Sequence, residues 1–173
     1  MGLLRNRHDD DAVGSRFQMR AKMWSIGDDF WIETEDGRKA YRVDGKALRV
    51  RKTFVLEDAG GREVAKLQER KLSVRDKMEI ERDGRSLATV KKRMIGIRDR
   101  FVIEVEGGPD MNAKGNLVDH EYEIERDGDT VAEVSKKWFR IRDTYGVEIA
   151  PGEDEALVLA VTVCIDAMSH PRD

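Results

Sequence analysis

Apolar and polar residues alternate along most of the chain, in short segments separated by turn residues. In the segment 101–105, Phe101, Ile103 and Val105 are apolar and Glu104 lies between them; 78–80 and 145–149 repeat the pattern. Successive side chains of a β-strand point to opposite faces, so this alternation predicts strands with one dry and one wet face. The acidic residues expected on the wet face are Glu79, Glu104 and Glu148.

Turn residues divide these segments at short intervals. An Asp-Gly pair suits a type I′ turn because both central positions need positive φ, which Gly accepts freely and Asp tolerates. Several such turns in succession predict an antiparallel β meander. The Asp-Gly pairs are Asp36–Gly37, Asp44–Gly45, Asp83–Gly84 and Asp127–Gly128, and Gly60–Gly61 occupies a similar position.

The meander is repetitive. The segment 79–105 recurs at 123–149, and the tripeptide Ile-Arg-Asp ends a similar unit in both. Adjacent strand residues point to opposite faces, so each Arg and Asp is expected to find a cross-strand partner. An active site normally needs one copy, so the repetition indicates architecture rather than catalysis. The Arg-Asp pairs are Arg75–Asp76, Arg98–Asp99 and Arg142–Asp143.

The C-terminal part breaks the alternation. Three acidic residues, 153–155, precede an unbroken apolar run at 156–165. Acidic residues stabilise the positive end of a helix dipole, and a helix that is apolar on all sides must be buried in protein. The sequence predicts a buried helix over Ala156–Met168, about 20 Å long and shorter than the roughly 30 Å of a membrane core. Its β-branched residues leave a buried strand as the alternative.

Length and composition predict a single domain at 19–170, preceded by a disordered tail at 1–18 that carries three consecutive aspartates. The chain has 173 residues, with 32 basic and 35 acidic side chains and a net charge of −3. This balance argues against nucleic-acid binding, which favours clustered excess basic charge. The N-terminal residues lack the apolar segment of a secretory signal, so a cytoplasmic location is expected. The sequence does not indicate the oligomeric state.

Candidate catalytic or metal-binding residues are sparse. The histidines His8, His120 and His170 are far apart in sequence, and Cys164 lies in the apolar run as a single cysteine. A metal site needs several convergent ligands, and nucleophilic catalysis needs Ser or Cys with a base. The sequence therefore predicts no catalytic residue, metal site or cofactor, and a protein that is not an enzyme.

Basic turns are the remaining candidate site. Lys91, Lys92 and Arg93 lie in one unit, and Lys136 and Lys137 in another, where Trp138 follows them. Neighbouring units can bring such turns to one rim of a barrel and form an anion-binding edge, with Trp138 as an apolar foot at a membrane interface. The competing interpretation is that lysines protect strand ends against aggregation and that Trp138 packs inward.

Four stretches resemble the LURP-one-related family. This resemblance implies a tubby-like closed antiparallel β-barrel of about 12 strands around the hydrophobic C-terminal helix. It also implies kinship with tubby C-terminal domains, which bind phosphoinositides, and with phospholipid scramblases, but it implies no catalytic motif. The stretches are MRAKMWSIGDDFWIE (Met19–Glu33), YRVDGKALRVRKTFVLED (Tyr41–Asp58), GNLVDHEYEIERDG (Gly115–Gly128) and AEVSKKWFRIRDTYGVEIAPGED (Ala132–Asp154).

Two functions follow as the main hypotheses, and an enzyme of unrecognised type is the third and least favoured alternative. The first is a binding or scaffold module that engages anionic phospholipid headgroups or a protein partner through the basic rim, peripherally at a membrane. The second is a carrier or sensor that holds a small apolar ligand in the barrel lumen. The C-terminal helix discriminates between them, because a helix that fills the lumen leaves no room for a ligand.

Overall fold

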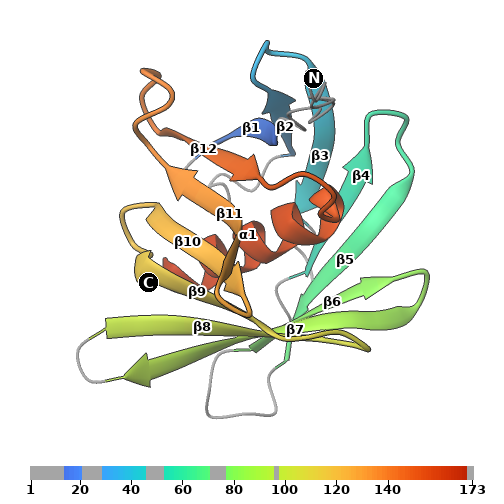
Figure 1. Cartoon of the computed structure of the whole chain (residues 1–173). Coiled ribbons are helices and arrows are strands. Elements are labelled where there is room, and N and C mark those ends of the chain that lie inside the picture. Colours follow the sequence, from blue (N-terminus) through green and yellow to red (C-terminus); the bar gives the residue numbers. More distant parts are fainter. Residues whose placement is uncertain (1–13, 21–28, 46–52, 71–76, 96–97, 171–173) are drawn as a thin grey trace, which may run out of the picture.

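Twelve antiparallel strands close into a barrel around one helix (Figure 1). The computed structural model describes residues 14–20, 29–45, 53–70, 77–95 and 98–170, and the side chains of 94–99 are not described. The architecture confirms the predicted fold. The elements are β1 (Ser15–Arg20), β2 (Phe30–Thr34), β3 (Lys39–Gly45), β4 (Thr53–Asp58), β5 (Glu63–Glu69), β6 (Lys77–Arg82), β7 (Arg85–Ile95), β8 (Arg98–Val105), β9 (Met111–Asn116), β10 (Glu121–Arg126), β11 (Asp129–Ser135), β12 (Thr144–Ile149) and α1 (Glu155–Ser169).

The strands follow one another around the barrel in chain order, and β1 closes it against β12. Ser15 pairs with Ile149 and Arg20 with Thr144 at the two ends of this closing ladder. Closure leaves no strand edge unpaired, which removes the template for edge-to-edge aggregation. β1 therefore belongs to the barrel from Ser15 onward, four residues before the predicted boundary, because Phe17 and Met19 face the core.

The helix α1 runs through the lumen and confirms the helical interpretation of the apolar run. Asp154 caps its start by accepting a hydrogen bond from the Leu157 backbone N–H at 3.1 Å. Arg82 donates to both carboxylate oxygens of Asp154, at 2.7 and 3.1 Å, and this hydrogen bonding lowers the Asp154 pKa. All side chains from Leu157 to Met168 are buried, so the barrel wall surrounds the helix on every side.

The inward strand faces form the core as the alternation predicts. Phe101, Ile103, Tyr145 and Val147 are fully buried against the helix, together with Leu56, Leu67, Met78, Ile80, Ile124 and Ile149. The outer face differs from the prediction at one position. Glu79 is only 9% exposed, because Arg70 covers it in an ion pair. Glu104 and Glu148 remain partly exposed and pair with Lys91 and Arg16.

Four of the five predicted turns are confirmed, and each connects two successive strands. At Asp83–Gly84 and Asp127–Gly128 both residues have positive φ, as a type I′ turn requires. In the pairs Asp36–Gly37 and Gly60–Gly61 only the second residue, Gly37 or Gly61, has positive φ. The prediction of a turn at Asp44–Gly45 is wrong: both residues lie in β3, and Gly45 pairs with Phe54 of β4.

The Ile-Arg-Asp repeats do not share one structure. Arg98–Asp99 opens β8, whereas Arg75–Asp76 lies outside the described residues. Arg142 and Asp143 precede β12 in an exposed loop, and the predicted cross-strand partners are wrong for this copy. Arg142 forms an ion pair with Asp143 itself, at 3.7 Å. Asp143 has a φ of 58°, so the chain turns there instead of continuing as a strand.

Candidate functional site

The candidate site lies at the end of the barrel where α1 ends, called here the helix-end rim. Because strands alternate in direction, odd-numbered strands end at this rim, and the connections that follow β9 and β11 lie there. Figure 1 shows both connections on the left, that between β9 and β10 near the C-terminus and that between β11 and β12 projecting at the upper left. The opposite end, where α1 begins, is called the helix-start rim.

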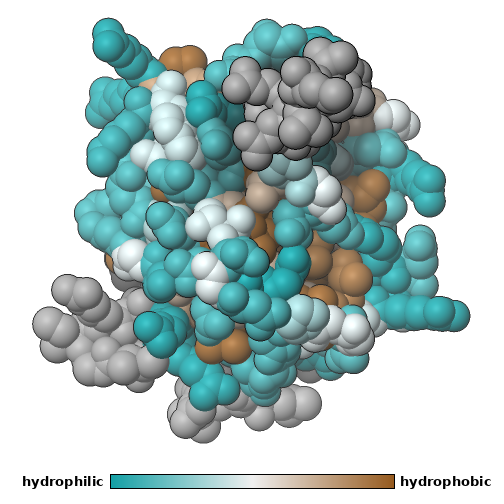
Figure 2. Space-filling model, in the orientation of Figure 1, coloured by the Kyte–Doolittle hydropathy of each residue, from teal (hydrophilic) through white to brown (hydrophobic). Residues whose placement is uncertain are grey.

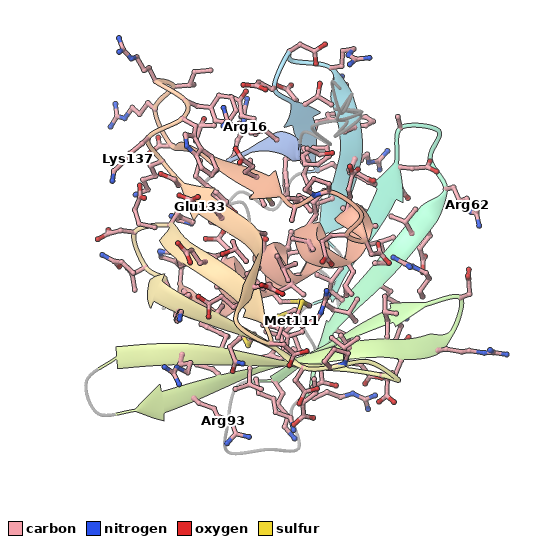
Figure 3. The ribbon with its side chains drawn as sticks, in the orientation of Figure 1. Arg16, Arg62, Arg93, Met111, Glu133 and Lys137 are labelled. Carbon is pink, nitrogen blue, oxygen red and sulfur yellow. The ribbon has the colours of Figure 1, made fainter. Side chains whose placement is uncertain are left out.

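The loop between β11 and β12, residues 136–143, combines exposed cations with an exposed apolar side chain. Lys136, Lys137, Arg140 and Arg142 are all exposed. Ile141 is 59% exposed, although large aliphatic side chains are usually buried. Figure 3 shows Lys137 on this projecting loop. At the position that the loop has in Figure 1, Figure 2 shows a small hydrophobic patch among hydrophilic side chains.

Trp138 and Phe139 hold this loop against the barrel. A Cβ atom at Gly146 of β12 would lie 2.6 Å from Trp138 Cε3 and 2.8 Å from Phe139 Cε2, so both rings occupy the space that a side chain would fill. The Arg16 guanidinium lies 4.8 Å from the centroid of the Trp138 ring, a cation–π contact. Trp138 thus packs on the outer face of the barrel, and Ile141 is the apolar group that the loop exposes.

The three cations of β7 have different surroundings. Lys91 donates to Glu104 on β8 at 2.5 Å. Lys92 follows the inward parity of Ala88 and Val90, and its Nζ lies 3.4 Å from the Met168 carbonyl oxygen at the end of α1. A cation there favours the negative end of the helix dipole. Lys91 and Lys92 thus have structural contacts.

Arg93 is the exposed cation of this group, and Figure 3 shows it far from Lys137. Four strand spacings, about 19 Å at about 4.8 Å each, separate β7 from β11. The six predicted residues therefore share a rim but do not form one patch. Lys136, Lys137 and Trp138 lie together on the β11–β12 loop. Arg140 and Ile141, which the sequence pattern did not indicate, belong to the same loop.

The two rims differ in charge and polarity. Val118, in the turn between β9 and β10, is 50% exposed, and with Ile141 it is one of the two exposed large apolar side chains among the described residues. Both lie at the helix-end rim. The connections at the helix-start rim carry more carboxylates than cations: Arg38, Arg62 and Arg85 lie at or next to them, against Glu35, Asp36, Asp83, Glu106, Asp110, Asp127, Glu153 and Asp154.

A buried polar cluster lies just inside the helix-end rim, formed by His120, Asp166 and His170 and called here the His–Asp–His cluster. His120 Nε2 lies 2.6 Å from Asp166 Oδ1, and His170 Nδ1 lies 3.3 Å from the same oxygen. The His120 ring stacks on Tyr145 with centroids 4.2 Å apart and on His170 at 5.4 Å. The fold thus brings together two histidines that are far apart in sequence.

Electrostatics couple these groups. Burial raises the pKa of Asp166, but the hydrogen bonds with His120 and His170 outweigh it, and the pKa is lowered. The hydrogen bond with Asp166 raises the pKa of His170. Burial, together with the Asp166 charge, raises the pKa of Tyr145 well above its usual value. These shifts favour the ionised carboxylate of Asp166 and the protonated ring of His170.

The barrel interior offers little else for chemistry. Cys164 is fully buried, and burial raises the pKa of its thiol, which makes it a poor nucleophile. α1 occupies the lumen, where the alternative hypothesis would place an apolar ligand. Across the described residues, no helix combines the length and the apolar character needed to cross a membrane.

Comparisons with known proteins agree with this fold. The sequence model of the LURP-one-related family matches residues 15–166. The chain is similar to an X-ray structure of a protein from Arabidopsis thaliana, with a TM-score of 0.70, 18% sequence identity and coverage of 92% of this chain and 93% of that chain. At this identity the likeness shows the fold alone. A comparison with curated proteins gave no match.

Proposed function

This chain belongs to the LURP-one-related family, and we propose that it is a non-enzymatic binding module that attaches peripherally to anionic membrane surfaces. The helix-end rim is the binding face, and the β11–β12 loop makes the main contact. The observation that carries this proposal is the exposure of Ile141 within a loop that also exposes Lys136, Lys137 and Arg140.

The composition of the loop fits a bilayer interface rather than a small anion. A phosphate ion would need cations alone, whereas an anionic bilayer offers a negative surface above an apolar layer. Each Lys or Arg close to such a surface contributes about 1 kcal/mol. Asp143 offsets Arg142 in the same loop, so the three remaining cations and a partly inserted isoleucine give about 3–4 kcal/mol, a dissociation constant of roughly 1–6 mM. Such binding is weak and reversible, as expected for a peripheral protein.

The charge difference between the rims supports an orientation. The net charge of −3 would repel the chain from an acidic membrane if its charges were spread evenly. The acidic connections instead lie at the helix-start rim, so the chain can present its basic loop while its acidic end faces away. Arg16 and Gly146 support this presentation, because both contact Trp138 and fix the base of the loop.

The test compares vesicles that differ only in headgroup charge. We expect the full chain to co-sediment with phosphatidylcholine vesicles that contain phosphatidylserine, and not with phosphatidylcholine vesicles alone. Binding should weaken as ionic strength rises, because the Debye length shortens from about 30 Å at 0.01 M to about 8 Å at 0.15 M. Equal binding to neutral vesicles, or no binding to the acidic ones at low salt, contradicts the proposal.

A further inference from the structure

The His–Asp–His cluster presents donor atoms that point to a common place. His120, Asp166 and His170 each offer one ligand atom, and these atoms all lie within 4.8 Å of one another. The His120 and Asp166 side chains are 4% and 2% exposed, and that of His170 is 14% exposed, which leaves a route from solvent at the rim. The cluster joins the end of α1 to the β9–β10 turn.

Polar atoms of the cluster lack hydrogen-bond partners. Asp166 Oδ2 and His120 Nδ1 are buried and have no hydrogen-bond partner among the described residues, and the same holds for Tyr145 Oη and Ser169 Oγ. Buried polar atoms in native proteins are nearly always paired, and one without a protein partner is explained by strain, by a functional role, or by a bound water or ion. The carboxylate oxygen is the most telling, because an unpaired anionic oxygen is costly to bury.

The position of the Asp166 carboxylate in α1 also favours a cation beside it. Asp166 lies in the last turns of α1, where the helix dipole is negative, and no basic residue occupies the last turn. Lys92 from β7 reaches the Met168 carbonyl oxygen, so one cation from the barrel wall approaches this end. Tyr122 and Tyr145 also face Asp166 and are neutral when protonated. A buried carboxylate at a negative helix end calls for positive charge in direct contact.

The donor set and spacing suit a metal of intermediate softness. Two imidazoles and one carboxylate are ligands of Zn²⁺, and three protein ligands leave a fourth position for water. Zn–N and Zn–O bonds of about 2.0–2.1 Å in a tetrahedron place ligand atoms about 3.3 Å apart. His170 Nδ1 lies 3.3 Å from Asp166 Oδ1, as such a site requires. His120 Nε2 lies 2.6 Å from the same oxygen, and this distance would widen when a metal binds.

Neighbouring contacts hold the two imidazoles in place. His120 stacks between Tyr145 and His170, with its ring nearly parallel to both, at 22° and 12°. His170 Nδ1 lies 3.2 Å from the Asp166 backbone carbonyl oxygen, and a further hydrogen bond to the backbone of Val118, in the turn that precedes His120, contributes to the raised pKa of His170. Histidine ligands commonly donate their second ring N–H to a backbone carbonyl, which fixes the tautomer and the ring orientation.

From this geometry we propose that His120, Asp166 and His170 bind one divalent metal ion of the Zn²⁺ class. The ion joins the C-terminal end of α1 to the β9–β10 turn and takes the place of the imidazole proton as the positive charge beside Asp166. This site is separate from the β11–β12 loop, and its existence does not depend on membrane binding.

The test titrates Zn²⁺ into full-length chain without a histidine tag, after treatment with a chelator. We expect one Zn²⁺ per chain by calorimetry and elemental analysis, and a melting temperature that rises with Zn²⁺ concentration. Mg²⁺, which prefers oxygen ligands, should have no such effect. Co²⁺ should give the visible absorption of a four-coordinate site without any substitution.

The matched variants are Asp166→Asn, His120→Gln and His170→Gln, with His8→Gln as the histidine control. Each of the three should weaken Zn²⁺ binding by more than about 100-fold, because loss of an outer-shell partner alone costs 10–100-fold. The control should bind as the unaltered chain does. Substitution of a buried ligand can unfold the chain. His170→Gln changes the most exposed of the three ligands, and the Co²⁺ spectrum is measured on the unaltered chain, so these two readouts avoid that problem. Absence of Zn²⁺ binding by the unaltered chain, or binding retained in all three variants, overturns the proposal and leaves a network that shares protons only.

Discussion

Replacing Leu159 by aspartate is expected to abolish cooperative folding. Leu159 is fully buried in α1, which the barrel wall surrounds. Removing a buried leucine side chain alone costs about 2–5 kcal/mol, and an unpaired buried charge adds several more. Native proteins are stable by only about 5–15 kcal/mol, so this sum reaches the whole stability of the domain. Circular dichroism should show loss of the barrel signal, and calorimetry no cooperative transition.

Two further variants make this prediction sharper. Leu159→Ala leaves a cavity without a charge and should lower the melting temperature by roughly 4–20 °C, at about 2–4 °C per kcal/mol for a domain of this size. Ile141→Asp places the same charge at an exposed aliphatic residue and should change stability by about 0.5 kcal/mol or less. A cooperatively folded Leu159→Asp chain would show that α1 is not the core of the barrel.

The second large effect is expected on membrane binding. Replacing Lys136, Lys137 and Arg140 together by glutamine removes three exposed cations of the β11–β12 loop. At about 1 kcal/mol each, their loss should weaken binding to phosphatidylserine vesicles by about 3 kcal/mol, or roughly 100-fold. Vesicle co-sedimentation measures this directly. The melting temperature should not change, because exposed substitutions of this kind rarely alter stability.

A matched control separates the loop from net charge. Arg38, Arg62 and Arg85 are exposed at or next to turns of the helix-start rim, and their replacement by glutamine removes the same total charge. If the loop makes the contact, this control should bind as the unaltered chain does, because charges beyond a Debye length of about 8 Å are screened. Equal losses in the two triple variants would mean that overall charge, and not the β11–β12 loop, governs binding.

Regular patterns made the fold predictable from the sequence. The alternation of 101–105 and 145–149 placed the core face correctly, because a strand has a period of two. The run at 156–165 could only be a buried helix or strand, and the acidic residues before it favoured the helix that begins at Glu155. The prediction of a turn at Asp44–Gly45 was wrong, because an Asp-Gly pair permits a turn without requiring one. Pairing with β4 continues β3 through Gly45.

The candidate sites were less predictable, because they depend on which strands become neighbours. Lys92 shares the parity of Ala88 and Val90, which indicates an inward side chain, but only the fold shows that it reaches the end of α1. The His–Asp–His cluster joins a turn to a helix end, so no local spacing reveals it. One signal was present: Asp166 is the single charged residue between Ala156 and Met168, and a buried carboxylate needs partners.

The most direct test of the proposed membrane contact places a fluorophore at the tip of the loop. Cys164 is fully buried and burial raises its thiol pKa, so an Ile141→Cys chain can be labelled at residue 141 alone with an environment-sensitive dye such as NBD. An Ala59→Cys chain, labelled in the exposed β4–β5 turn at the helix-start rim, is the control. With phosphatidylserine vesicles, we expect a blue shift and enhanced emission at position 141 and no change at position 59. An unchanged spectrum at 141, or equal shifts at the two positions, would contradict attachment through the β11–β12 loop.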